Sequence, residues 1–335
     1  MLIVKTSSMG DVVHALPAVS DLARHRPGTQ IDWVVEEAFA EIPRLHRDVT
    51  RVIPIALRRW RAQLVLPSTW NEMRSARRAL REARYEQILD LQGLVKSAFV
   101  ARCAGGEVAG PGGRGARERV ASWLYDRRIS VDPNLHAIDR ARSLAAQTFG
   151  YEPDVALDFG IRVPKLATGA LQPWIGEQRF ALLLTNASRA SKLWPDENWR
   201  AIEEWLAEQG LASVLVWGSE RERAATVRRA APMYSARVAP PAGLETLAAI
   251  CTRAALVIGL DTGLTHWAAA VGAPTVGIFC DYDPAQVGLK ADDRRVNLGG
   301  VADCPSSEDV IDAVRHVLAA AAAPSSVPLA GEQRG

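Results

Sequence analysis

Asp11 stands where a short apolar run changes into a helical pattern, and a carboxylate at such a junction can accept a proton or bind a hydroxyl. Residues 2–4 are apolar and include the β-branched Ile3 and Val4, which predicts a buried strand, and apolar residues recur at helical spacing over residues 12–22. The Ser-Ser-Met-Gly turn between them, residues 7–10, lacks the three-glycine spacing of a dinucleotide site and is not followed by Gly-Lys-Ser/Thr. Asp11 is therefore expected either to face a ligand site at the carboxyl end of a parallel strand or to cap the helix. The turn makes that site unsuited to NAD or a Walker-type nucleotide.

The sharpest motif of the second half is Leu260-Asp-Thr-Gly-Leu-Thr-His, in which an apolar strand leads into a helix. Gly263 lets the backbone approach a ligand closely, and the first amide groups of the helix, in residues 262–264, predict an anion site. Asp261 is then left to bind sugar hydroxyls. His266 lies one turn along, where it either contacts the same anion or is an ordinary core histidine. The alternating strands and helices around the motif exclude an aspartic protease.

Two further loops follow strands in the second half. In residues 185–195, Lys192 comes after a hydroxyl-rich loop that contains Ser188, and its compact positive charge suits a pyrophosphate. In residues 216–222, Glu222 either accepts hydrogen bonds from ribose hydroxyls or stabilises the start of a helix. Together with the motif at residue 261, these loops outline one anion pocket.

The first half carries a concentration of positive charge. Eight arginines and only two glutamates occur between residues 58 and 84, further arginines follow a glycine-rich loop at residues 105–115, and Lys96 stands at another strand-to-helix turn. Acidic saccharides, anionic lipid head groups and nucleic acid are the polyanions that such a surface attracts. The net charge of the whole chain is only +2, and no nucleic-acid-binding module is visible, so we expect no nucleic-acid partner. Trp60, Trp70 and Trp123 lie in the same Arg-rich surroundings, either as a partly apolar binding surface or as ordinary packing.

The elements that must position these residues alternate between apolar strands and helices. Strands are expected at 31–35, 87–91, 181–184, 212–217, 255–260 and 275–279, and helices at 70–84, 199–209, 244–252, 264–271 and 307–321. This pattern predicts an α/β fold with two parallel-sheet halves around a cleft. The halves are residues 1–165 and 175–321, joined by a linker within 159–178, and residues 322–335 form a disordered tail. Alternatively, the last helix, residues 307–321, packs back on the first domain.

Composition adds four expectations. The four cysteines show neither paired nor metal-ligand spacing, which indicates reduced thiols in a cytoplasmic protein. No apolar stretch reaches membrane-spanning length, and no signal peptide is visible at the start of the chain. Asp281-Tyr-Asp283 matches the Asp-x-Asp metal-binding motif found in some enzymes, but Pro284 makes it a turn, so no metal is expected. No cofactor is expected either.

These motifs together resemble the lipopolysaccharide heptosyltransferase I family, inverting GT-B glycosyltransferases that use ADP-heptose. The likeness extends from Leu2 to about Val317 and is carried by residues 4–11, 32–37, 52–54 with 58–60, 91–97 and 261–264. The related heptosyltransferase II shares the donor half but is less similar in the N-terminal half. The resemblance implies the GT-B architecture, two Rossmann-like domains whose parallel sheets face a central cleft.

The resemblance also implies a reaction, the transfer of L-glycero-D-manno-heptose from ADP-heptose to Kdo2-lipid A at the cytoplasmic face of the inner membrane. Asp11 corresponds to the catalytic base, and Lys192 is expected to stabilise the leaving group. The donor side is expected at Ser188, Lys192, Glu222, Asp261, Thr262, Gly263, Leu264 and His266. The acceptor side is expected at Ser8, Met9, Gly10, Arg58, Arg59, Arg61, Lys96 and Arg117. Ala187 departs from the family pattern by lacking a hydroxyl, and Ala242 is smaller than the residue expected to cover the adenine.

Three other functions stay open on sequence grounds. The first is a heptosyltransferase II or another ADP-sugar transferase with a different acceptor. The second is a nucleotide-sugar-binding protein without catalysis. The position of Asp11 beside an open strand end argues against this function. The third, a nucleic-acid binder that uses the arginines, is the weakest because the net charge is near zero.

Overall fold

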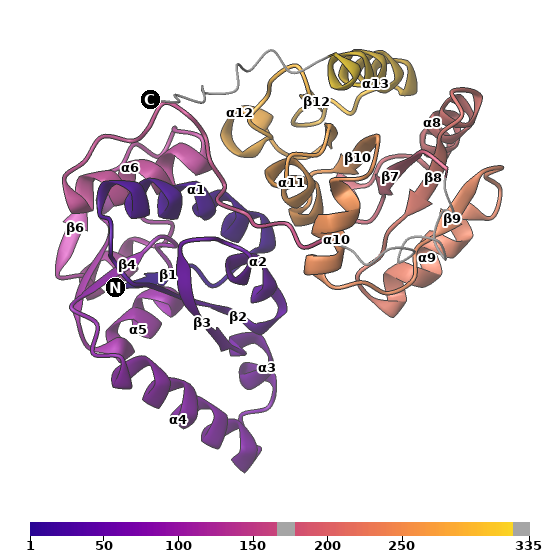
Figure 1. Cartoon of the computed structure of the whole chain (residues 1–335). Coiled ribbons are helices and arrows are strands. Elements are labelled where there is room, and N and C mark those ends of the chain that lie inside the picture. The colour runs from indigo at the N-terminus through magenta and orange to yellow at the C-terminus, as the bar shows by residue number, and fades with distance from the viewer. Residues whose placement is uncertain (166–177, 324–335) are drawn as a thin grey trace, which may run out of the picture.

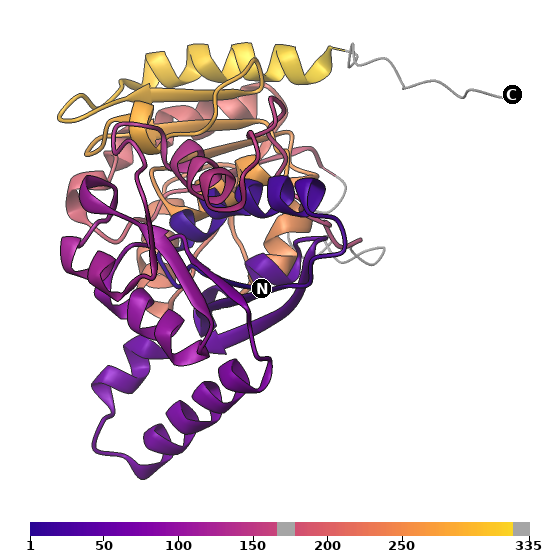
Figure 2. The same cartoon turned by 90° about the vertical axis from the view of Figure 1, so that its left-hand side faces the viewer.

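The computed structural model describes residues 1–165 and 178–323, which form two α/β domains (Figure 1). The predicted boundary at residue 175, most of the predicted linker and nearly all of the predicted tail lie outside the described residues. The two domains lie side by side and contact each other through helices rather than through a shared sheet (Figures 1 and 2).

The first domain is built on six parallel strands in the order β3-β2-β1-β4-β5-β6. The strands are β1 (Leu2–Val4), β2 (Ile31–Glu36), β3 (Val49–Ile55), β4 (Gln87–Asp90), β5 (Glu107–Pro111) and β6 (Arg127–Ile129). On one face lie α1 (Met9–His25) and α6 (Ala137–Phe149), and on the other lie α4 (Pro67–Glu82) and α5 (Val95–Ala104) (Figure 1). The short helices are η1 (Glu37–Phe39), α2 (Glu41–Arg44), α3 (Leu57–Ala62), η2 (Gly113–Gly115) and η3 (Arg119–Leu124).

The second domain repeats this plan with the order β12-β11-β10-β7-β8-β9. Its strands are β7 (Phe180–Leu184), β8 (Ala212–Leu215), β9 (Ala236–Val238), β10 (Leu256–Leu260), β11 (Thr275–Phe279) and β12 (Arg295–Gly299). Its helices are η4 (Ala190–Lys192), α8 (Asp196–Glu208), α9 (Glu220–Ala230), α10 (Leu244–Cys251), α11 (Gly263–Ala270), α12 (Pro284–Val287) and α13 (Ser307–Ala322). The predicted α/β class with two parallel sheets is confirmed.

Both sheets follow the doubly wound order, in which the chain reverses direction beside the first strand of the domain. In the first domain the reversal lies between β1 and β4, and in the second it lies between β7 and β10. The loops that carry Asp11, Lys96, Lys192 and Asp261 follow these four strands. Ligands of open α/β sheets bind at such reversal points, so the topology places all four loops where a ligand site is expected.

The final helix, α13, packs on the second domain, against α8 and the strands β10 to β12. Its buried residues Val310, Ala313, Val314 and Val317 belong to the same core as Trp199 of α8. The alternative that α13 packs back on the first domain is therefore wrong. Its apolar stripe instead completes the core around the sheet of the second domain.

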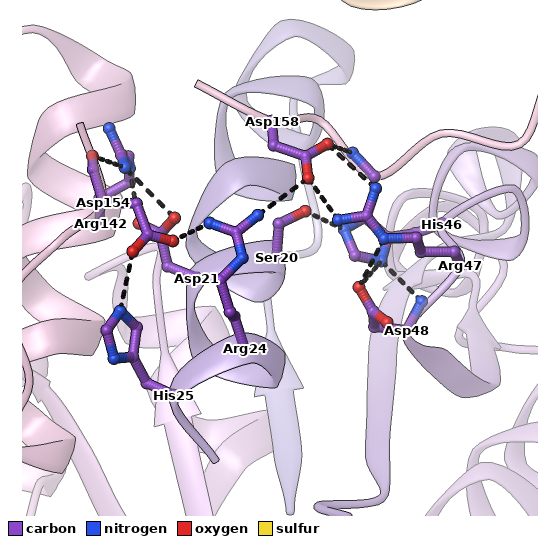
Figure 3. A network of polar contacts seen from close by, with 11 residues as sticks. Ser20, Asp21, Arg24, His25, His46, Arg47, Asp48, Arg142, Asp154 and Asp158 are labelled. Atoms are coloured by element: carbon purple, nitrogen blue, oxygen red, sulfur yellow. Dashed lines mark hydrogen bonds and ion pairs between the residues drawn. The ribbon is translucent and has the colours of Figure 1, made fainter. Parts of the chain in front are cut away.

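A network of charged side chains fastens the segment after α6 to the first domain (Figure 3). Asp158 accepts hydrogen bonds from Arg24 and Arg47, and Asp154 pairs with Arg24 and His25. Gly160, with φ of 64°, lies so close to His46 that a Cβ atom there would be 2.4 Å from its Nε2. The chain is thus held against the first domain as far as residue 162, whose N–H donates to the Leu45 carbonyl at 2.8 Å.

Cys280 and Cys304 form a disulfide, with 4.5 Å between their Cα atoms. This corrects the expectation of four reduced thiols. The two residues are 24 positions apart in sequence and are brought together because β11 and β12 are paired neighbours, a relationship that cysteine spacing does not reveal. Cys103 and Cys251 are free thiols.

Two features are absent from residues 1–165 and 178–323. No helix there combines the length and the apolar character needed to cross a bilayer. No three His, Cys, Asp or Glu side chains there gather in an arrangement that would hold a metal ion.

Candidate active site

Asp11 lies in the first turn of α1, at the carboxyl end of β1. Its Oδ2 accepts hydrogen bonds from the backbone N–H of Ser8 at 3.0 Å and from the Ser8 hydroxyl at 2.9 Å, so the predicted capping role is real. The guanidinium of Arg117 donates to both carboxylate oxygens, and the Nζ of Lys5 lies 3.9 Å from Oδ1. The side chain stays partly exposed, so a ligand can reach it.

Opposing effects act on the acidity of this carboxyl. Burial alone would raise the pKa of Asp11, but the positive charges of Lys5 and Arg117 and the Ser8 N–H lower it well below the ordinary value of 3.8. Asp11 is therefore ionised at neutral pH. An ionised carboxylate is the form that can accept a proton from an attacking hydroxyl.

A cavity of about 270 Å³ opens beside Asp11 within the first domain. Its polar lining is strongly basic and includes Lys5, Arg114, Arg117 and Arg140. Burial is the first of the causes that lower the pKa of Arg140, and the nearby charge of Arg117 lowers it further. Four positive groups around the single carboxylate of Asp11 leave an excess of positive charge, which favours an anionic ligand such as a carboxylate or phosphate.

Lys96 borders the Asp11 loop as expected. Its Nζ donates to the Ser7 hydroxyl at 2.8 Å, and the backbone of the same loop is held by Gln92, whose Oε1 accepts from the N–H and hydroxyl of Thr6 at 2.7 Å. Ser8 is exposed at the start of α1, while Met9 and Gly10 are half-buried and turn toward the second domain. Of these three predicted acceptor residues, Met9 and Gly10 also contribute to the contact between the domains.

The predicted cluster of three arginines on α3 is divided by its partners. Arg59 is neutralised by Glu37 and Glu72, at 3.0 and 2.9 Å. The Arg58 guanidinium lies over the ring of Phe39, and Arg61 is exposed. Arg58 and Lys96 are close enough for the charge of Arg58 to lower the pKa of Lys96, after the larger effect of burial. Arg58 therefore extends the basic side of the site, whereas Arg59 serves the local structure.

In the second domain, Asp261 gathers the predicted donor residues. Its Oδ2 accepts from Lys192 Nζ at 2.5 Å, and its Oδ1 lies 3.4 Å from His266 Nε2. Burial would raise the pKa of Asp261, but the hydrogen bonds from His266 and Lys192 lower it. The Lys192 ammonium also lies 4.6 Å from the ring centre of Tyr282.

The start of α11 has the form that the sequence predicts. Thr262 is the N-cap, and the amides of Gly263 and Leu264 occupy the first turn, where a helix has no internal acceptors for them. Two other predicted donor residues, Ser188 and Glu222, are not among the side chains that pair with Asp261 in the described part of the chain. Ser188 is exposed in its loop, and Glu222 accepts from the Gly218 N–H at 2.7 Å, which is the structural role foreseen as its alternative.

The two half-sites meet at the domain interface. His14 of α1 and His266 of α11 approach to 3.3 Å between Nε2 and Nδ1, and a Cβ on Gly10 would lie 3.2 Å from the His266 ring. Burial, followed by the charges of His266 and His136, lowers the pKa of His14 well below 6.5. A continuous run of polar side chains therefore leads from the Asp11 helix through the histidines to Asp261.

Asp281 and Asp283 have structural partners. Asp281 accepts from the Ser191 hydroxyl at 2.9 Å, and Asp283 caps α12 by accepting from the Ala285 N–H at 2.9 Å. These contacts give the motif the turn and capping roles that the sequence analysis preferred.

Sequence reasoning missed Arg140, His136 and Tyr282 as members of the site. Arg140 lies on α6, far along the chain from the Asp11 loop, and Tyr282 reaches Lys192 from the turn after β11. His136 donates its Nε2–H to the Gly288 carbonyl, 3.0 Å away in the other domain. None of them stands in a recognisable motif, and only the fold brings them together.

Comparison with known proteins decides the family. The sequence model of glycosyltransferase family 9 (heptosyltransferase) matches residues 73–310. Lipopolysaccharide heptosyltransferase 1 of Pseudomonas aeruginosa is 40% identical over 306 residues, which cover 91% of this chain and 84% of the relative. The chain belongs to glycosyltransferase family 9. It is a glycosyltransferase, and the resemblance drawn from its motifs is confirmed.

Solved structures agree with membership of family 9. Heptosyltransferase WaaC of Escherichia coli with ADP has a TM-score of 0.85 and 35% identity, with 94% of this chain and 99% of that chain covered. The same enzyme with ADP-2-deoxy-2-fluoro heptose has a TM-score of 0.82 and 35% identity, covering 94% and 98%. The GT-B arrangement of two Rossmann-like domains is therefore confirmed for this family 9 chain.

Proposed function

We propose that this enzyme transfers L-glycero-D-manno-heptose from ADP-heptose to a Kdo hydroxyl of Kdo2-lipid A, with inversion at the anomeric carbon. ADP-heptose is supported as the donor by the similarity of this chain to heptosyltransferase 1 of P. aeruginosa and to WaaC of E. coli. The WaaC structures contain ADP and ADP-2-deoxy-2-fluoro heptose. The observation that carries the proposal is the meeting of two half-sites, an ionised Asp11 beside a basic cavity and the Lys192–Asp261 pair at the start of α11.

The first domain would hold the acceptor. The cavity beside Asp11 presents Arg114, Arg117 and Arg140, which suit the carboxylates of Kdo. A guanidinium that now pairs with Asp11 can turn to a substrate carboxylate and leave Asp11 free to receive the hydroxyl proton. Asp11 would act as general base, a role that contributes about 10²–10⁴-fold to a rate.

The second domain would hold ADP-heptose. Negative charge develops on the diphosphate as the bond to the anomeric carbon breaks, and Lys192 with the first amides of α11 would stabilise it. Asp261 would bind hydroxyls of the sugar or ribose, held in orientation by Lys192 and His266. Attack from the side opposite ADP gives inversion in one step. We further propose that the enzyme works peripherally at the cytoplasmic face of the inner membrane, because its acceptor is a lipid.

The decisive test is release of ADP by the purified protein from ADP-heptose, with and without Kdo2-lipid A, beside Asp11→Asn. We expect release that depends on the acceptor and falls by about 10²-fold or more in the variant. Calorimetric binding of ADP-heptose should stay within a few-fold of wild type in Asp11→Asn, which separates catalysis from folding and donor binding.

Other results would redirect the proposal. Donor binding without turnover of Kdo2-lipid A, but with turnover of a heptosylated core, would move the assignment to a heptosyltransferase II reaction. Donor binding without any turnover would favour a nucleotide-sugar-binding protein. Full activity in Asp11→Asn would refute the assignment of the base while leaving the reaction standing.

A further inference from the structure

The helical layer of α4, α5 and η3 presents a second surface of unusual composition. On α4 the buried or core-packed positions are Thr69, Met73, Ala76 and Leu80, which form one stripe along the helix. One flank of that stripe carries, at helical spacing, Trp70, Arg74, Arg77 and Arg81. Arg78 lies on the side of the helix away from the core. The amphipathic pattern therefore turns a row of arginines, begun by a tryptophan, toward solvent.

Large apolar side chains stand exposed on the neighbouring elements. Phe99 on α5 is 64% exposed and Trp123 on η3 is 72% exposed, accompanied by Val95 and Val120. The turn before α4 adds Val65, which is 91% exposed, between Leu64 and Leu66. The elements are contiguous, because α5 packs against both α4 and η3. Single exposed apolar residues are ordinary, but a cluster of this size on one layer marks an interaction site.

The arginines of α4, and Arg61 just before it, lack acidic partners among the described residues. Among the described residues, Arg61, Arg77 and Arg78 are in no ion pair, and the hydrogen bonds of Arg74 and Arg81 go to the uncharged groups of Asn71 and Cys103. Many other arginines of this domain, such as Arg24, Arg47 and Arg142, are paired with aspartates. Positive potential therefore remains available to an anionic partner.

No part of the second domain packs on this layer among the described residues. The domain contacts run instead through α1 with α11, α2 with α10, and α6 with α12. Figure 1 shows α4 and α5 on the side of the sheet away from α6, and Figures 1 and 2 both show α4 projecting from the body of the protein. We call the exposed residues 70, 74, 77, 78, 81, 95, 99, 120 and 123 the outer face.

The outer face borders the acceptor site. Val95 points outward, whereas the next residue, Lys96, reaches the Ser7 hydroxyl beside Asp11. The Val95 N–H donates to Glu118 at 2.7 Å, and Glu118 follows Arg117, the partner of Asp11. A partner bound to the outer face would thus lie at the edge of the basic cavity.

We propose that the outer face docks on an anionic phospholipid bilayer, an inference that rests on the proposed function because it explains how a lipid acceptor reaches Asp11. Tryptophan and phenylalanine insert at the level of the head groups, while arginines bind phosphates and extend their stems along apolar surface. The adjoining cavity then receives the sugar part of a lipid whose acyl chains stay in the bilayer.

The test is flotation of the full chain with phosphatidylcholine vesicles, prepared with and without phosphatidylglycerol. We expect binding only when the anionic lipid is present, and a loss of about tenfold or more for Arg74→Gln/Arg77→Gln/Arg78→Gln. The same sites changed to lysine should bind nearly as wild type, because the attraction is electrostatic. The variant Phe99→Ser/Trp123→Ser should lose binding to a similar extent.

Matched controls come from exposed residues of the second domain. Tyr234→Ser/Val301→Ser controls for loss of apolar surface, and Arg200→Gln/Arg228→Gln/Arg253→Gln controls for loss of charge; both should float as wild type. Equal loss in these controls would overturn the proposal. Failure of the wild-type chain to bind anionic vesicles would also overturn the proposal. If sedimentation then showed a dimer that Phe99→Ser/Trp123→Ser breaks, the outer face would be a contact between two copies of this chain.

Activity on two acceptors separates this inference from the proposed function. Outer-face variants should turn over a deacylated, water-soluble acceptor as wild type does, but lose about tenfold or more on acceptor embedded in vesicles. If the wild type turns over neither acceptor yet floats with anionic vesicles, the proposed function fails and the docking surface stands. If turnover of vesicle-embedded acceptor is unchanged in the variants, the docking surface is refuted and the reaction stands.

Discussion

Met9 and Gly263, the first residues of α1 and α11, lie against each other across the domain interface. A Cβ atom on Gly263 would lie 2.5 Å from the Cβ of Met9 and 2.6 Å from its Cγ. The helix that carries Asp11 and the helix that begins at the anion site therefore start at one point. Close approach of the domains depends on the absence of a side chain at residue 263.

We predict that Gly263→Ala weakens donor binding and turnover together. The added methyl group must displace Met9 or separate the two helices, and overpacking of this kind costs about 1–3 kcal/mol. We expect the Kd for ADP-heptose, measured by calorimetry, to rise about tenfold if the cost is borne by the closed arrangement.

A second substitution tests the cause. Met9→Gly combined with Gly263→Ala should recover much of the donor affinity, because it removes the Cβ that the new methyl group meets. Met9→Ala should recover little, since its Cβ remains. Equal donor affinity in all of these variants would show that the domains do not pack in this way when donor binds.

Arg117→Gln should change the pH dependence of the reaction. Arg117 is one of the groups that hold the pKa of Asp11 below its ordinary value, so its loss raises that pKa. A base works only when deprotonated, and the acid limb of kcat/KM should therefore move to higher pH. The acceptor KM should also rise about tenfold through the loss of a charged hydrogen bond.

Arg114→Gln is the matched control for that experiment. Arg114 lines the same cavity, but its guanidinium is not a partner of Asp11. This variant is expected to raise the acceptor KM while leaving the acid limb in place. Superimposable profiles for both variants would contradict the Arg117–Asp11 pairing.

The sequence predicted most of the strands that are buried on both sides, with β5 (Glu107–Pro111) as the exception. Strands β1, β7 and β10 are short apolar runs, and β4 has an apolar centre at Ile88 and Leu89, because helices cover both faces of a parallel sheet. The ligand loops follow these four strands. The edge strands β6 (Arg127–Ile129) and β9 (Ala236–Val238) went unrecognised, since each has three residues and an exposed arginine at its centre.

The site was predicted where a motif follows a strand and missed where tertiary structure supplies the residue. Asp11 and Asp261 were found from strand-to-helix junctions. The pairing of Arg59 was not foreseen because its partner Glu37 lies in a different element, 22 residues away, which a count of charges does not reveal. Arg140 joins the cavity only because α6 packs beside α1. Contacts between distant segments are what the sequence pattern lacks.

The Cys280–Cys304 disulfide is predicted to stabilise the turn that carries Tyr282 over Lys192. A cross-link over a separation of 24 residues contributes about 3 kcal/mol by restricting the unfolded chain. Cys304→Ala should lower the free energy of unfolding in urea by about that amount. Denatured wild-type protein should expose only the thiols of Cys103 and Cys251 until a reductant is added, and detection of all four thiols without reductant would contradict the bond.

His46 is predicted to make folding stability depend on pH. Its Nδ1 accepts from the Asp48 N–H at 3.1 Å and its Nε2 lies 3.0 Å from the Ser20 hydroxyl, so the neutral ring is held in one tautomer (Figure 3). Burial is the main reason that the pKa of His46 falls to about 4.

The sign follows from proton binding. As pH falls below the unfolded value of 6.5, the unfolded chain binds a proton at this residue that the folded protein refuses until about pH 4. Stability is therefore complete above pH 6.5 and is lost between these values, by up to about 1.4 kcal/mol per pH unit. His46→Asn keeps an acceptor for the Asp48 N–H but cannot titrate, so urea midpoints should vary less steeply over this range. The control His316→Asn, on the exposed side of α13, should keep the wild-type dependence of the urea midpoint on pH. If His46→Asn also keeps that dependence, the pH sensitivity lies in other buried groups such as His14.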